Sequence, residues 1–129
     1  MRRAGRGFTL IELLIVVVIV GILALAAIPL IMNNTRDARR AEGEQMMGAA
    51  RDFCRAEYAK TGNTSNVSTA FGVQAANGAF SGKYYSVPTF AASSTVAGMD
   101  ASVQTNAAAD GQGRMDFSWE SGAASFSWP

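Results

Sequence analysis

The chain has 129 residues, with 11 Lys and Arg, 10 Asp and Glu, one Cys and no His. The missing histidine removes the commonest general base and the commonest metal ligand of proteins. The composition therefore argues against an enzyme, and it predicts neither a cofactor nor a metal site. The lone Cys54 cannot form an intrachain disulfide, and we expect it to be buried and inert rather than paired between subunits.

The charges divide the chain into a basic start and a slightly acidic remainder. Arg2, Arg3 and Arg6 precede a long apolar run, and beyond them 8 Lys and Arg face 10 Asp and Glu. A nucleic-acid-binding surface needs clustered Lys and Arg, so nucleic acid is not indicated as a partner. The length allows one modest domain in addition to the apolar run.

The apolar run is long enough to cross a membrane. Residues 13–32 carry no charged or strongly polar side chain, and twenty residues of helix rise about 30 Å, the thickness of a bilayer's hydrocarbon core. Glu12 lies just inside one end of this segment. A carboxylate there is costly unless it stays hydrated or is paired, which makes Glu12 a candidate functional residue.

Two ordinary interpretations account for part of this segment. A secretory signal peptide would be cut after "ALA" (24–26), and it would release a small secreted binding module that begins at Ala27. However, the apolar run continues beyond this site as far as Met32, and an acidic residue is not expected at its head. A plain membrane anchor explains the length but leaves Glu12 without a role.

A third interpretation comes from "RGFTLIELLIVVVIVGILALAAIP", which resembles the type III signal of type IV prepilins and pseudopilins. In that family a membrane peptidase cuts after the glycine and methylates the new N-terminus. The resemblance places the cut between Gly7 and Phe8 and the methyl group on Phe8. It also matches Glu12 to the family's glutamate at the fifth mature position, and Gly21 and Pro29 to its glycine and helix-kinking proline.

The resemblance implies a structural function. The chain would be a single-pass prepilin of the inner (cytoplasmic) membrane, with residues 1–7 as a cleaved basic leader. It would then become the subunit of a helical homo-oligomeric filament, an extracellular type IV pilus. The implied partners are a prepilin peptidase, an inner-membrane platform protein and an assembly ATPase. The alternative within the family is a pseudopilin of a type II secretion system.

The resemblance also implies a partner for the buried charge. In a filament the apolar helices bundle and exclude water, so a carboxylate at Glu12 is tolerable only when it is paired. The amine created at Phe8 of a neighbouring subunit would provide the cation. Such a pair would fix the axial register of the subunits, because a shifted subunit leaves both charges unpaired in hydrocarbon.

Residues 8–60 are predicted to form one long helix. Residues 33–60 are amphipathic, with an apolar stripe at three- and four-residue spacing that consists of Met46, Ala49, Ala50, Phe53 and Ala56. Gly62, two residues after Lys60, is typical of a helix C-terminal cap.

The first part of this helix, residues 8–32, is predicted to be the membrane span and later the filament core. Pro29 lacks an N–H, and Gly21 weakens a helix by about 1 kcal/mol relative to Ala. Residues 21–29 are therefore expected either to kink gently or to unwind on assembly.

The segment that follows the long helix has little charge. Residues 61–82 are rich in Gly, Asn, Ser and Thr, and we expect a mostly irregular loop with one short helix near residues 68–76. A strand is predicted at residues 83–90, with Pro88 at an edge or bend, and a weaker one at residues 100–108.

The clearest strand signal is a hairpin near the end of the chain. "MDFSW" (115–119) and "ASFSW" (124–128) both alternate apolar and polar residues around a four-residue loop. This register places three facing pairs on one face of the sheet: Phe117–Phe126, Trp119–Ala124 and Met115–Trp128. The predicted sheet anchors are the four aromatic members of these pairs: Phe117, Trp119, Phe126 and Trp128.

The segment "ADGQGRMD" (109–116) contains two acids in a pattern that suggests a calcium loop, but the acids are few and D-G-x-G favours a tight turn. Together the elements predict an α+β pilin fold. It has one long N-terminal helix packed on a small C-terminal antiparallel sheet of three to four strands, and residues 61–129 form the globular head.

Overall fold

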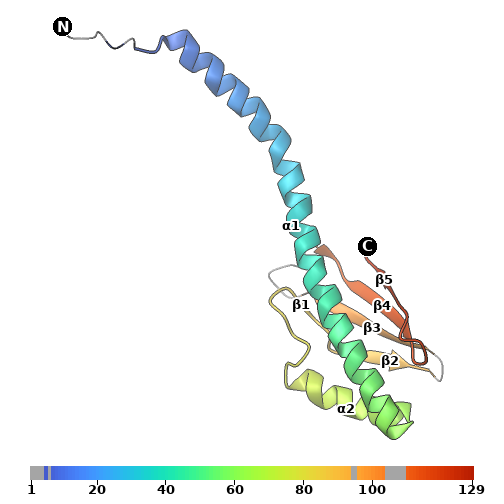
Figure 1. Cartoon of the computed structure of the whole chain (residues 1–129). Helices are drawn as coiled ribbons and strands as arrows, with labels where there is room; N and C mark the ends of the chain where they lie inside the picture. Colours follow the sequence, from blue (N-terminus) through green and yellow to red (C-terminus); the bar gives the residue numbers. More distant parts are fainter. Residues whose placement is uncertain (1–4, 6, 94–95, 104–109) are drawn as a thin grey trace. The chain divides into compact units, whose positions relative to one another are not determined.

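The architecture is taken from a computed structural model that describes residues 5, 7–93, 96–103 and 110–129, with the backbone alone for residues 96 and 99–103. Most of the predicted leader thus lies outside the described residues. The elements, shown in Figure 1, are α1 (Leu10–Thr61), α2 (Thr64–Ala76), β1 (Tyr85–Ser86), β2 (Phe90–Ala92), β3 (Val96–Val103), β4 (Gly113–Ser118) and β5 (Ala124–Ser127). Internal contacts divide the chain into two units, Met1–Thr35 and Arg36–Pro129.

The first unit consists of the apolar part of α1. The helix runs without interruption through Gly21 and Pro29. More than half of every large apolar side chain between residues 10 and 32 is exposed. Within the described part of the chain, α1 is the one helix that is long and apolar enough to cross a membrane.

The second unit begins with the rest of α1, which ends as predicted. Gly62 has a φ of 64°, in the left-handed region that glycine adopts without strain. Its N–H donates to the Tyr58 carbonyl at 2.7 Å, which satisfies one of the last helical acceptors. The predicted cap at Gly62 is therefore confirmed.

The helix α2 is longer than the sequence predicted, because it begins at Thr64 rather than near residue 68. Asn63 caps it: the Asn63 side chain accepts the Ser65 N–H at 2.8 Å. Val67 and Phe71, four residues apart, bury one face of α2 in the core. The expectation of a mostly irregular segment was wrong, since this cap and this apolar pair are enough for a helix.

All strand pairs of the sheet are antiparallel, in the order β1-β3-β4-β5, with β2 also paired to β3. Because β4 occupies the other side of β3, β1 and β2 lie one after the other along the same edge. The sheet is four strands wide where β2 pairs with β3, and it is narrower where β1 pairs with the end of β3. Residues 36–61 of α1 pack on it (Figure 1), and the predicted α+β fold of a long helix on a small antiparallel sheet is confirmed.

Two predicted strands differ in their bounds. Residues 83–90 form no single strand but divide into β1 and β2, with Pro88 between them, because proline cannot donate to a ladder. The strand predicted at residues 100–108 begins earlier, at Val96, and its last five residues lie outside the described residues.

The predicted hairpin register was wrong by two residues. Met115 faces Phe126 and Phe117 faces Ala124. The Ser118 N–H donates to the Ala123 carbonyl, so the loop is residues 119–122, and Gly122, at a φ of 72°, donates its N–H to the Ser118 carbonyl at 2.9 Å. This turn takes Trp119 out of the strand. A slip of two residues leaves every side chain on its predicted face, because strands have a period of two.

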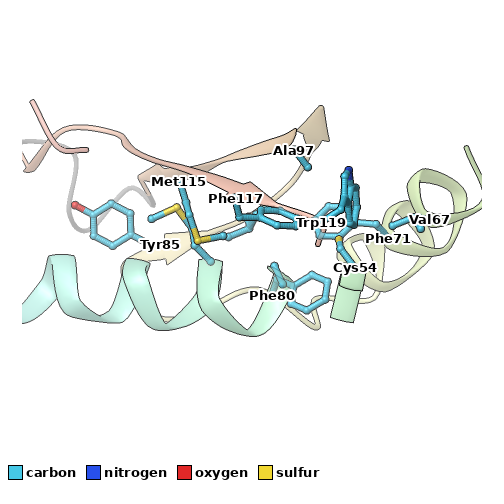
Figure 2. Close-up of a cluster of buried hydrophobic side chains, with 12 residues drawn as sticks. Cys54, Val67, Phe71, Phe80, Tyr85, Ala97, Met115, Phe117 and Trp119 are labelled. Atoms are coloured by element: carbon cyan, nitrogen blue, oxygen red, sulfur yellow. The ribbon is translucent and has the colours of Figure 1, made fainter. Parts of the chain in front are cut away.

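The core lies between the sheet and one face of α1 (Figure 2). That face is Gly43, Met47, Ala50 and Cys54. It is rotated from the predicted stripe, and Ala49 and Ala56 are exposed. Burying Met47 and Cys54 removes more apolar area from water than burying two alanines, which explains the rotation. Cys54 is buried as predicted.

Candidate functional site

The predicted cleavage point lies in front of the helix. Gly7, Phe8 and Thr9 have no regular secondary structure, and Phe8 is 88% exposed. A Cβ added at Gly7 would meet no atom within 4 Å. The Gly7–Phe8 peptide bond is therefore in an exposed, non-helical segment, the kind of backbone that a peptidase can bind.

Glu12 and Thr9 together form the start of α1. The Thr9 N–H and hydroxyl donate to Oε2 of Glu12 at 2.8 and 2.9 Å, and the Glu12 N–H donates to Oγ1 of Thr9 at 3.4 Å. This reciprocal arrangement is a capping box, which satisfies backbone donors that the helix leaves unpaired. The sequence interpretation missed Thr9, although T-x-x-E before an apolar run is the signature of such a cap.

Glu12 is the only charged residue between positions 7 and 32. Its Oε2 accepts both bonds from Thr9, and Oε1 accepts none from the described residues. The carboxylate thus has a local partner for one oxygen at the helix N-terminus, where negative charge is favoured by the helix dipole. The other oxygen is available for a cation.

Gly21 and Pro29 occupy helical positions in the first unit. A Cβ at Gly21 would meet nothing within 4 Å, so no packing within this chain requires a glycine there. Pro29 lacks the N–H that would donate to the Leu25 carbonyl. The helix therefore has one backbone acceptor without its usual donor in an apolar stretch.

The four predicted sheet anchors in the second unit differ in burial. Phe117 and Trp119 are buried, with ring centroids 5.1 Å apart, and Trp119 donates its indole N–H to the Ser93 carbonyl at 3.0 Å. Trp128 is half-buried. Phe126 lies on an edge strand and is 42% exposed, so it does not reach the core.

Charged side chains of α1 form hydrogen bonds with residues near the end of the chain. The guanidinium of Arg39 forms a two-point ion pair with the buried Asp110 carboxylate, with Nη2 2.7 Å from Oδ1. Arg40 donates to the Asp110 carbonyl at 3.0 Å and to the Pro129 carbonyl at 2.9 Å. Such two-point pairs fix both position and orientation.

Two glutamates of the same helix segment complete these contacts. Glu42 Oε1 accepts the Tyr84 and Tyr85 N–H groups at 2.9 and 3.4 Å. Glu44 Oε1 accepts the indole N–H of Trp128 at 2.9 Å. The sequence interpretation assigned no role to these residues, because their partners lie 42 to 84 positions away and leave no local pattern.

The Arg39–Asp110 pair shifts the pKa of both of its members. The hydrogen bond from Arg39 lowers the pKa of Asp110, and the same bond raises the pKa of Arg39. Burial raises the pKa of Tyr85, whose hydroxyl donates to the Gly111 carbonyl at 3.3 Å. Gly111 has a φ of 79°, the left-handed backbone that the predicted tight turn at D-G requires.

Comparison with known proteins gives one match. Residues 2–28 match the prokaryotic N-terminal methylation motif. No curated protein and no solved structure matches the chain significantly. The matched range contains the predicted cleavage point, the Thr9–Glu12 cap and most of the exposed apolar helix.

Proposed function

From an N-terminal methylation motif typical of type IV pilins and type II secretion pseudopilins, we propose that this chain is the structural subunit of an extracellular type IV pilus. The chain is a prepilin-like protein of a structural, non-enzymatic kind, with a hydrophobic N-terminal helix consistent with a membrane anchor. The proposal rests on one observation: the chain has this motif together with an exposed apolar helix that carries a single charge at its start.

Processing is proposed to begin at the Gly7–Phe8 bond. Hydrolysis by a prepilin peptidase releases residues 1–7 and leaves an amine on Phe8, which then receives a methyl group from a methyl donor. The exposure of Phe8 and the absence of helix before Leu10 support this site. The motif implies such a peptidase and an assembly machinery, which we propose to include a platform protein and an ATPase.

Assembly is proposed to depend on Glu12. Cleavage creates a cation at Phe8, next to Thr9 and four residues before Glu12, and the free Oε1 of Glu12 can accept a hydrogen bond from the same amine of a neighbouring subunit. Residues 13–32 need a covering that the described part of the chain does not provide. The bilayer supplies that covering before assembly, and the helices of other copies supply it in the filament.

The unpaired Leu25 carbonyl bears on how the helix behaves in the filament. We propose that residues 21–29, between Gly21 and Pro29, are the segment that unwinds on assembly, because they already lack one backbone hydrogen bond. Unwound backbone in an apolar bundle needs partners from protein or trapped water.

The experiment that tests the proposal is the N-terminal mass of the chain, measured from membranes and from filaments sheared off cells. The expected first residue in both fractions is Phe8 bearing one methyl group. A first residue of Ala27 means that a signal peptidase discards the apolar segment, and this would overturn the filament proposal. An unprocessed Met1 in sheared filaments would overturn the cleavage site.

A pseudopilin shares the same motif, and the distinction depends on the filament. A pilus subunit is expected in filaments that extend beyond the cell envelope under native expression. Electron microscopy with an antibody to the head distinguishes the two. Labelled filaments confined to the envelope would assign the chain to a secretion system instead.

A further inference from the structure

The indole of Trp128 fills a slot between α1 and β4. A Cβ added at Gly43 would lie 2.8 Å from Cη2 of Trp128, and one added at Gly113 would lie 2.5 Å from the same atom. Real Cβ contacts are not this short, so both positions need glycine for the indole to fit. Tyr85 closes the slot with its ring at 5.3 Å in an edge-to-face arrangement.

Charged side chains of α1 hold the indole in this slot. Glu44 accepts the indole N–H at 2.9 Å, and the Arg40 guanidinium carbon lies 5.3 Å from the ring centroid, within cation–π range. Arg40 also donates to the carbonyl of Pro129 at 2.9 Å. We call Arg40, Gly43, Glu44 and Gly113 the Trp128 clamp.

The rest of β5 has few other attachments. It is an edge strand with β4 as its one neighbour among the described strands. Ser125, Phe126 and Ser127 are all exposed. With a single cysteine in the chain, no intrachain disulfide can tie β5 to the helix. The clamp is therefore the main contact between the end of this strand and α1.

We propose that the Trp128 clamp is a lock that keeps β5 on the head when the head is pulled. When the indole leaves its slot, β5 separates from β4, while α1, β3 and β4 stay packed around Met115 and Phe117. Arg51 and Arg55 of α1 hold the loop before β5 through the Gly122, Trp119 and Glu120 carbonyls, so β5 opens from its Trp128 end. An edge strand of this kind can open as a local unit rather than with the whole domain. The pulling load rests on the proposed filament function, but the lock itself does not.

Hydrogen exchange can separate the two kinds of opening, because neighbouring amides of the hairpin report different contacts. The Ser118 N–H donates to the Ala123 carbonyl, so residues 118 and 123 are a hydrogen-bonded pair. By the alternation of antiparallel ladders, the Ser125 and Ser127 amides then face β4. The amides of Met115 and Phe117 face β3 instead.

The test uses the full chain in detergent micelles, with Arg40→Met and Gly43→Ala as separate variants. Arg40→Met removes the cation and its bonds to the Asp110 and Pro129 carbonyls and keeps a long apolar stem. Gly43→Ala keeps every charge and pushes against the indole and the Tyr85 ring. In both we expect the Ser125 and Ser127 amides to exchange about tenfold faster. The Met115 and Phe117 amides should keep their wild-type rates.

Arg36→Met is the matched control, since Arg36 is exposed on the same helix and forms no hydrogen bond with the described residues. It should leave all four rates unchanged. Unchanged Ser125 and Ser127 rates in both clamp variants would overturn the lock. An equal rise at all four amides in both variants would also overturn it, because the clamp would then act on the whole fold.

A second measurement concerns load. Filaments are sheared and then treated briefly with protease. The Arg40→Met filaments should release head peptides that wild-type and Arg36→Met filaments retain, and mass spectrometry detects these peptides. Intact Arg40→Met heads after shear would overturn the role under load. If none of the three chains forms filaments, the proposed function fails, while the exchange experiment in micelles still decides the lock.

Discussion

The two halves of α1 differ in where their stabilising partners are found. Residues 10–32 expose more than half of each large apolar side chain and have one charge, at Glu12. Residues 39–55 bury Met47, Ala50 and Cys54 and use their charged side chains to bind the head. One half leaves its apolar side chains exposed, and the other half packs against its own chain.

The difference teaches which changes act on assembly and which act on folding. On the proposed function, a substitution at Glu12 acts mainly on a contact with a neighbouring subunit, and within the isolated chain it loses only the Thr9 cap at the helix start. A substitution in the core of the head removes a contact that the chain makes with itself. The following predictions test this division, beginning with the largest expected effect.

Glu12→Gln should abolish filaments while the membrane-bound chain remains at its normal level. The change leaves a neighbour's Phe8 amine buried without its counter-charge at every subunit, a loss of about a thousandfold in association per contact. Immunoblots of sheared and membrane fractions measure both quantities. Asp52→Asn, on the exposed face of the other half, is the control. Normal filament yields from Glu12→Gln would show that this half needs no charge pair.

Phe117→Ala should destabilise the head by about 3–5 kcal/mol, because it removes a fully buried ring from the core. Phe126→Ala, in the same hairpin but 42% exposed, should cost less than about 1 kcal/mol. Unfolding of the full chain in micelles, followed by tryptophan fluorescence, gives both values. Equal losses of unfolding free energy in the two variants would mean that the edge strand stabilises the head as much as the core does, which would contradict the difference expected from burial.

Acidification should destabilise the head through Asp110. Its pKa is lower in the folded state than in the unfolded chain, because Arg39 donates to it. The unfolded chain therefore binds a proton first as the pH falls below about 4, and stability is lost from there downward. Asp110→Asn should lower the melting temperature at pH 7 by less than Phe117→Ala does, and it should flatten the acid limb. An unchanged acid limb would assign the loss to other carboxylates.

Thr9→Val should have the smallest effect. It removes the hydroxyl that donates to Glu12 and accepts its N–H, at a cost of about 1 kcal/mol for a lost cap. Hydrogen exchange of residues 10–13 in micelles should accelerate about fivefold. Thr35→Val is the control, since the Thr35 hydroxyl donates to the Ile31 carbonyl within the helix and caps nothing. Equal acceleration near both positions would contradict a role for the capping box.

The sequence predicted most about the features that short patterns encode. The long helix, the cap at Gly62 and the left-handed backbone at Gly111 all follow from neighbouring residues. The alternation in the hairpin predicted which residues share a face, because that depends only on a period of two. The Thr9 cap is also encoded locally, because T-x-x-E places both of its partners within four residues.

Features that depend on partners far away in the chain could not be predicted from the sequence. The register of β4 and β5 depends on how the loop places Trp119, whose indole N–H finds the Ser93 carbonyl 26 residues away. The buried face of α1 is chosen by what the sheet presents to it, so the stripe through Ala49 was a reasonable but wrong prediction. The partners of Arg39 and Glu44 come from the far end of the chain.

The buried thiol of Cys54 has a consequence for experiments on living cells. Burial raises the pKa of Cys54 to about 12, so almost none of it is thiolate at neutral pH, and thiolate is the form that reacts with disulfides and alkylating reagents. In an oxidising compartment the chain thus keeps its one thiol out of mixed disulfides while the head stays closed. When an alkylating reagent is present at neutral pH, an opening of the core by force would be recorded as a permanent covalent label at this single position.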